Sequence, residues 1–89
     1  MNKLEEAREL IQQIDEQMIE LFKKRMQASK MVAEYKNQNH LPITDHKREK
    51  ELVNRNLQKL NMQELEAYYL LFFEGVLQAS KAYQKDLLK

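Results

Sequence analysis

Apolar side chains recur through residues 2–37 with a step of seven residues. One heptad position holds Leu4, Ile11, Met18 and Val32, and the other holds Ala7, Ile14, Leu21, Ala28 and Tyr35. A repeat of 3.5 residues is typical of a coiled-coil-like seam. The same range contains neither Gly nor Pro. The pattern therefore predicts one uninterrupted helix over about residues 2–37.

The segment 38–44 interrupts this pattern and predicts a loop. Amide side chains cluster there beside Pro42, and the residue before a proline is biased away from helix. Thr44 or Asp45 then offers a side-chain oxygen that can accept a hydrogen bond from the first free N–H groups of a following helix.

Two further helices are expected, over about residues 45–60 and 63–87. Gly75 interrupts the apolar pattern of the last one and suggests a close approach of another helix. The whole chain has one Gly and one Pro, too few for the turns of a sheet-rich fold. We predict a single all-α domain over residues 1–89, with three helices, one of them very long.

The first helix is too long for a compact chain of this size. Thirty-six helical residues span roughly 54 Å, whereas a compact 89-residue monomer has a diameter near 30 Å. An overhanging apolar seam needs a partner, and a second copy of the chain is the simplest one. We therefore expect an intertwined homodimer.

The net charge and the composition of the chain argue against several classes of function. A net charge of +1 gives no electrostatic case for nucleic acid. The absence of Cys excludes disulfides and thiol chemistry, and His40 and His46 lack the spacing of a metal site. No apolar run reaches the roughly 20 residues of a membrane span, and the charged N-terminus does not resemble a secretory signal. We expect a cytoplasmic protein without metal or membrane partner.

Two cations interrupt the apolar stripe of the first helix. Arg25 occupies a heptad position where Ile or Leu is expected, and Lys36 follows it by 11 residues. At 100° per residue the two side chains lie within about 20° of each other. A charge on a buried face is costly unless it meets an opposite charge, so this pair predicts a site for an anion.

Polar residues also interrupt the faces of the other two helices. Asp45, Arg48 and Glu49 are grouped at the start of the second helix, and Ser80 and Gln84 lie within the apolar face of the third. Together these groups suit a small dianion that also carries hydroxyl or ether oxygens. Arginine favours carboxylates because its guanidinium group can donate two parallel hydrogen bonds.

Arg8 lies too far along the first helix to join this set in its own chain. It precedes Arg25 by 17 residues, which is roughly 25 Å along the axis and about 100° around it. In a dimer with crossed long helices, Arg8 could instead reach the site of the partner.

Each residue also has a structural interpretation. Arg25 can fix the register of a helix pair, and Lys36 can complement the dipole at a helix C-terminus. Asp45, Arg48 and Glu49 can form a cap with a solvated ion pair. The joint occurrence of these residues favours a binding site.

The order and spacing of these polar residues resemble those of the all-helical AroQ-type chorismate mutases over nearly the whole chain. The residues that carry the resemblance are Arg8, Asp15, Arg25, Lys36, Asp45, Arg48, Glu49, Ser80 and Gln84. The resemblance implies an intertwined dimer with two active sites. It also implies the Claisen rearrangement of chorismate to prephenate, on the route to Phe and Tyr, without cofactor, metal or covalent catalysis.

The resemblance assigns a role to each site residue. Arg25 and the Arg8 of the second chain would clamp the carboxylates of chorismate, with Arg48 and Ser80 as further contacts. Lys36 and Gln84 would hydrogen-bond the ether oxygen, and Glu49 with the Asp45 region would contact the ring hydroxyl. The implied catalytic residues are Arg25, Lys36, Glu49 and Gln84.

Two alternatives stay open at this point. An isochorismate-pyruvate lyase would share the fold and much of the charge set. A non-catalytic helical module for dimerisation or regulation would use the same seam without turnover. A fused or docked shikimate-pathway enzyme is a further partner to consider.

Overall fold

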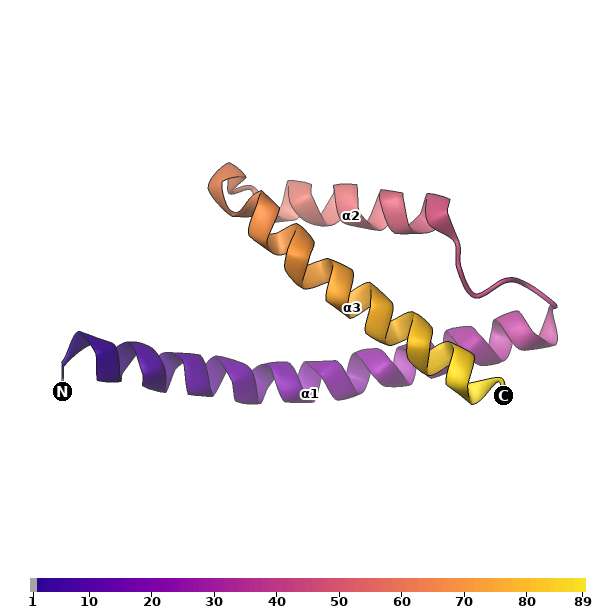
Figure 1. Ribbon diagram of the computed structural model, residues 1–89, viewed down its shortest axis with the longest axis horizontal. Coiled ribbons are helices and arrows are strands. Elements are labelled where there is room, and N and C mark those ends of the chain that lie inside the picture. Colours follow the sequence, from indigo (N-terminus) through magenta and orange to yellow (C-terminus); the bar gives the residue numbers. More distant parts are fainter. Residues whose placement is uncertain (1) are drawn as a thin grey trace.

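The computed structural model describes residues 2–89, and these form an all-helical chain without strands (Figure 1). Helix α1 spans Lys3–Gln38, α2 spans His46–Leu60 and α3 spans Glu66–Leu87, with a short 3₁₀ turn, η1, at Gln63–Leu65. The prediction of three helices, one of them very long, is confirmed. No helix in the described range is long and apolar enough to cross a membrane.

Side-chain caps set the first residue of α1 and of α2. Oδ1 of Asn2 accepts a hydrogen bond from the backbone N–H of Glu5 at 2.9 Å, and Oδ1 of Asp45 accepts one from Arg48 at 3.1 Å. Each cap satisfies a backbone donor that has no partner inside its helix. Both helices therefore begin one residue later than the apolar pattern predicts, and Asp45 serves as the cap of α2.

Helix α2 ends at Leu60 and is capped by Asn61, which adopts a left-handed backbone conformation with φ 49° and ψ 39°. Asparagine tolerates this conformation better than most residues, so it ends a helix without a glycine. The backbone N–H of Asn61 bonds to the carbonyl oxygen of Leu57, and the chain then reverses into α3.

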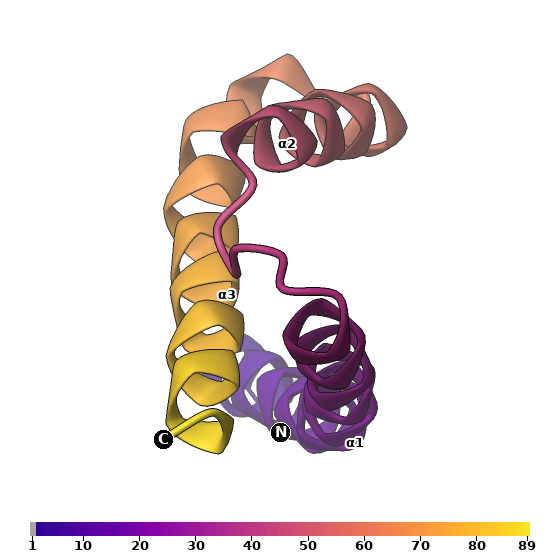
Figure 2. The same ribbon diagram turned by 90° about the vertical axis from the view of Figure 1, so that its right-hand side faces the viewer.

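Helix α3 holds the fold together because it packs against both other helices. It runs diagonally from α2 to the C-terminal half of α1, and the end-on view shows α1 and α2 at opposite ends of it (Figures 1 and 2). Within residues 2–89, α1 and α2 make no close backbone approach to each other. The open side between them is bridged by the loop that follows α1.

The interior of the fold is small and aromatic. Phe73 is buried and stacks on Tyr69, with 5.4 Å between the ring centroids. The hydroxyl of Tyr69 accepts a hydrogen bond of 2.9 Å from Nδ2 of Asn56, which ties α3 to α2. Gly75 does not sit at a close approach, because a Cβ atom placed there would meet nothing within 4 Å in the chain. That expectation was wrong for contacts within one chain.

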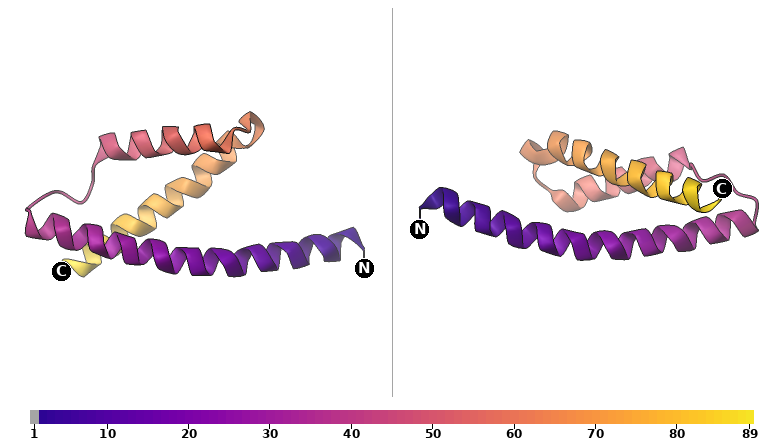
Figure 3. Two further views of the ribbon diagram at one scale, coloured as in Figure 1. Left: turned by 180° about the vertical axis from the view of Figure 1, so that it is seen from behind. Right: turned by 60° about the horizontal axis from the view of Figure 1, so that its bottom comes forward.

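The chain is extended rather than compact. Its dimensions are 55 × 26 × 16 Å and its radius of gyration is 16.3 Å, against about 12 Å for a compact chain of this length. The N-terminal part of α1 extends past the other helices (Figure 3). The apolar residues of the heptad seam there are exposed, among them Leu4, Ile11, Ile14 and Leu21. The described chain thus leaves its longest apolar stripe uncovered.

Candidate functional site

A groove of about 400 Å³ lies where α1, α2, α3 and the loop after α1 come together. Seven of the eight residues predicted to bind the substrate line it, namely Arg25, Lys36, Asp45, Arg48, Glu49, Ser80 and Gln84. Three helices and a loop supply these side chains, so the fold brings together residues that are up to 59 positions apart. A wider depression of about 590 Å³ on α2 contains only Glu49 of this set.

Arg8 is the predicted site residue that does not line this groove. It is exposed on the N-terminal part of α1. The helix is continuous from Lys3 to Gln38, so the separation of about 25 Å from Arg25 holds. Within one chain, Arg8 and the groove are separate.

Arg25 is held at the groove by an aromatic ring. Its guanidinium carbon lies 5.7 Å from the centroid of Phe73, the buried ring in the N-terminal half of α3. A cation over an aromatic face is attracted by the negative face of the ring. No carboxylate of residues 2–89 lies within ion-pair distance of Arg25. Its charge therefore faces the groove without an internal counter-ion.

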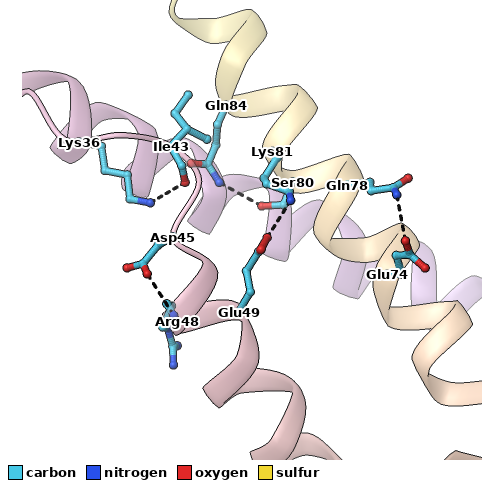
Figure 4. Close-up of polar contacts among 10 residues, drawn as sticks. All are labelled: Lys36, Ile43, Asp45, Arg48, Glu49, Glu74, Gln78, Ser80, Lys81 and Gln84. Carbon is cyan, nitrogen blue, oxygen red and sulfur yellow. Dashed lines mark hydrogen bonds and ion pairs between the residues drawn. The ribbon is translucent and has the colours of Figure 1, made fainter. Parts of the chain in front are cut away.

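Lys36 joins α1 to the loop that closes the end of the groove. Its Nζ atom donates a hydrogen bond of 2.8 Å to the carbonyl oxygen of Ile43, and the side chain is half-buried (Figure 4). An ammonium group has three donors, so two remain for a ligand. Lys36 also lies in the last turn of α1, where a cation complements the helix dipole.

Asp45 and Arg48 lie at the outer edge of the groove. Both side chains are exposed, and Asp45 uses one carboxylate oxygen on the backbone N–H of Arg48 (Figure 4). The capping interpretation of Asp45 is thus confirmed. The guanidinium of Arg48 has no carboxylate within ion-pair distance in the described chain.

Glu49 forms an ion pair with Lys81, a residue that sequence reasoning missed. Nζ of Lys81 lies 2.8 Å from Oε1 of Glu49, and the two side chains are 29% and 22% exposed. Oε1 of Glu49 is fully buried, and its contact with the ammonium lacks the alignment of a hydrogen bond. The contact is therefore chiefly one of charge. The partners lie on different helices, and no spacing within either helix indicates their proximity.

Three buried polar side chains line the crossing of α1 and α3. The hydroxyl oxygens of Ser29 and Ser80 are 2.5 Å apart, and Nε2 of Gln84 donates to Oγ of Ser80 at 3.2 Å. Oε1 of Gln84 is buried without a hydrogen-bond partner. Sequence reasoning also missed Ser29. Its position, four residues after Arg25 and seven before Lys36, places it on the same face of α1.

The groove is therefore cationic and rich in hydrogen-bonding groups. Arg25, Lys36 and Arg48 bring positive charges that no carboxylate of the described residues neutralises, whereas Glu49 is paired with Lys81. No group of His, Cys, Asp and Glu residues in the range 2–89 could hold a metal ion. Such a site can bind a small anion with two carboxylates and orient it through neutral donors.

Comparisons with known proteins agree with this chemistry. The family model of type II chorismate mutases matches residues 7–85. The chorismate mutase of Methanocaldococcus jannaschii is 35% identical over 91 residues, which cover 100% of this chain and 91% of the relative. No solved structure matches the chain significantly.

Proposed function

Because the chain belongs to the type II chorismate mutase family and is an enzyme that converts chorismate to prephenate, we propose that its three-helix groove is the active site. One observation supports this most directly. Three cations that have no carboxylate partner among residues 2–89 share one groove with a buried serine and a buried amide. Chorismate is a dicarboxylate with an ether oxygen and a ring hydroxyl, so its groups complement those of the groove.

The reaction itself explains why positioning suffices. The ether C–O bond breaks while a new C–C bond forms within the same molecule, and no proton is transferred. Catalysis then consists of holding the folded conformer and stabilising the negative charge that develops on the ether oxygen. Fixed cations and amide donors on rigid helices can do both.

The carboxylates of chorismate are assigned to the arginine side of the groove. The guanidinium group of Arg25 lies over the ring of Phe73, and this contact favours its placement at the groove. Such a group can donate two parallel hydrogen bonds to one carboxylate. Arg48 supplies a further cation at the outer edge, and Ser80 offers a buried hydroxyl that lines the same groove.

The ether oxygen is assigned to Lys36 and Gln84, which line the same groove from α1 and from α3. Lys36 keeps two donors after its hydrogen bond to the loop. Gln84 keeps one amide hydrogen beyond the one that it shares with Ser80. The two side chains can therefore donate to one oxygen as its charge grows. Glu49 is assigned to the ring hydroxyl, with Asp45 near it.

The uncovered seam of α1 supports a dimer. Residues such as Ile11 and Ile14 are half exposed in the single chain, at 55% and 51%, and a second copy could bury both seams symmetrically. Crossed long helices would bring the second chain's Arg8 to the groove, where it would meet a substrate carboxylate. We propose this intertwined homodimer, with Arg8 acting across the interface.

The test is a chorismate disappearance assay on the purified chain, with prephenate measured as the product. Isochorismate is assayed in parallel, with release of pyruvate as the measured signal. Prephenate formation that exceeds pyruvate release is expected. If the chain is an isochorismate-pyruvate lyase, pyruvate release will exceed prephenate formation. If it is a non-catalytic module, neither product will form. The cytoplasmic location and a fused or docked shikimate-pathway enzyme stay predictions.

A further inference from the structure

The contact between Lys81 and Glu49 differs from the other ion pairs of the described chain. Lys23 with Glu20 and Lys89 with Asp86 are exposed pairs of residues three positions apart. Exposed pairs of this kind contribute little to stability. The Lys81–Glu49 pair instead joins α3 to α2, and both side chains are more than two thirds covered.

The pair also lies in the wall of the groove. Lys81 directly follows Ser80 on α3, and Glu49 directly follows Arg48 on α2 (Figure 4). A covered carboxylate is costly without a nearby cation. Lys81 is the cation that lies within ion-pair distance of Glu49 in the described residues. Lys81 therefore supplies the opposite charge that Glu49 faces and holds this carboxylate against α3.

A carboxylate has two oxygens, and the contact with Lys81 occupies the side of Oε1. The second oxygen stays available to accept a hydrogen bond from a ligand hydroxyl. The pair also cancels one charge of each sign, so that Arg25, Lys36 and Arg48 remain to meet a dianion.

We propose that Lys81 is a positioning residue that holds the Glu49 carboxylate oriented toward the ring hydroxyl of chorismate. This inference rests on the proposed active site, because it gives Glu49 a substrate group to bind. Lys81 acts through Glu49 and makes no contact with the substrate itself. A lysine that bound a substrate carboxylate directly would act independently of Glu49.

A double-mutant cycle separates these two roles. The kcat and KM for chorismate are measured for the wild-type chain, Lys81→Met, Glu49→Gln and the double variant. We expect each single change to lower kcat/KM about tenfold, and the double variant to be little worse than either one. Lys81→Arg should retain most of the activity, because it keeps a cation near Oε1 of Glu49. Lys23→Met is the matched control for an exposed ion pair and should be unchanged.

Two outcomes would overturn the inference. If Lys81→Met lowers kcat/KM by the same factor in the wild-type chain and in the Glu49→Gln variant, Lys81 contacts the substrate directly. If Lys81→Met leaves kcat/KM unchanged in both, the ion pair has a structural role only. Thermal unfolding of each variant identifies any loss of fold. If Lys81→Met does not fold, Lys81→Gln takes its place in the cycle. An inactive wild-type chain would refute the proposed function instead, so the two failures are distinguishable.

Discussion

Ser29 of α1 and Ser80 of α3 are joined by a hydrogen bond, with 2.5 Å between hydroxyl oxygens that are 51 residues apart in sequence. Both side chains are buried, and Oγ of Ser80 also accepts a hydrogen bond from Nε2 of Gln84. One hydroxyl thus links the crossing of two helices to the orientation of the amide that faces the groove. Packing and site geometry are coupled at this point.

The first prediction concerns stability. Ser29→Ala removes a buried hydrogen bond and leaves the Ser80 hydroxyl with one partner fewer. We expect the free energy of unfolding to fall by about 1–3 kcal/mol, measured by denaturant titration at a fixed protein concentration. Lys30→Ala, at the exposed neighbouring position, is the control and should change little. A Ser29→Ala chain as stable as the wild type would show that the hydrogen bond contributes no net stability.

The second prediction separates charge from packing at Arg25. Arg25→Leu places an apolar residue where the heptad pattern favours one, so the fold and the association of the chain should be kept. The loss of the cation should lower kcat/KM for chorismate by at least about two orders of magnitude, or roughly 2.7 kcal/mol. Lys23→Leu is the matched change at an exposed position of the same helix and should be neutral for activity. If Arg25→Leu retains the wild-type activity, Arg25 does not bind the substrate and serves only to fix the register of a helix pair.

The sequence could predict those parts of the molecule that depend on local periodicity. The heptad step and the scarcity of Gly and Pro predict the long helix, and 100° per residue places Arg25 and Lys36 on one face. Contacts between helices are not local. Lys81 was missed because its partner lies 32 residues away on α2. The glycine at position 75 leaves room for a neighbouring helix, but within the described chain no atom lies within 4 Å of a Cβ placed there. An approach by a helix of a second chain stays a prediction.

The third prediction concerns the donor at position 84. Gln84 donates a hydrogen bond at any ordinary pH because a neutral amide does not titrate. An ordinary glutamic acid loses its proton at about pH 4.3, so Gln84→Glu would place a negative charge beside the oxygen on which negative charge develops. We expect kcat of the variant to be low at neutral pH and to rise as the pH falls toward 5. The wild-type chain, measured in the same buffers, provides the reference profile. A variant whose profile parallels that of the wild type would place position 84 away from the ether oxygen.

The fourth prediction tests whether Arg8 acts across the dimer. Arg8→Ala and Arg25→Ala chains should each be nearly inactive alone. In a mixed dimer, the Arg8→Ala chain keeps its own Arg25 and would receive an intact Arg8 from the other chain, so one of the two sites is whole. Equal mixing with free exchange of subunits should restore at most about one quarter of the wild-type activity. No recovery, despite demonstrated exchange, would exclude the crossed arrangement.

A complementary experiment tests the same role of Arg8 by a loss of activity instead of a recovery. A double variant, Arg8→Ala with Arg25→Ala, is mixed in equal amount with the wild-type chain. If Arg8 acts across the interface, both sites of a mixed dimer are incomplete. The activity per wild-type chain should then fall by about half. If Arg8 acts within its own chain, each wild-type chain keeps its site and the activity is unchanged. The exposed position of Arg8, roughly 25 Å along α1 from Arg25, favours the first outcome.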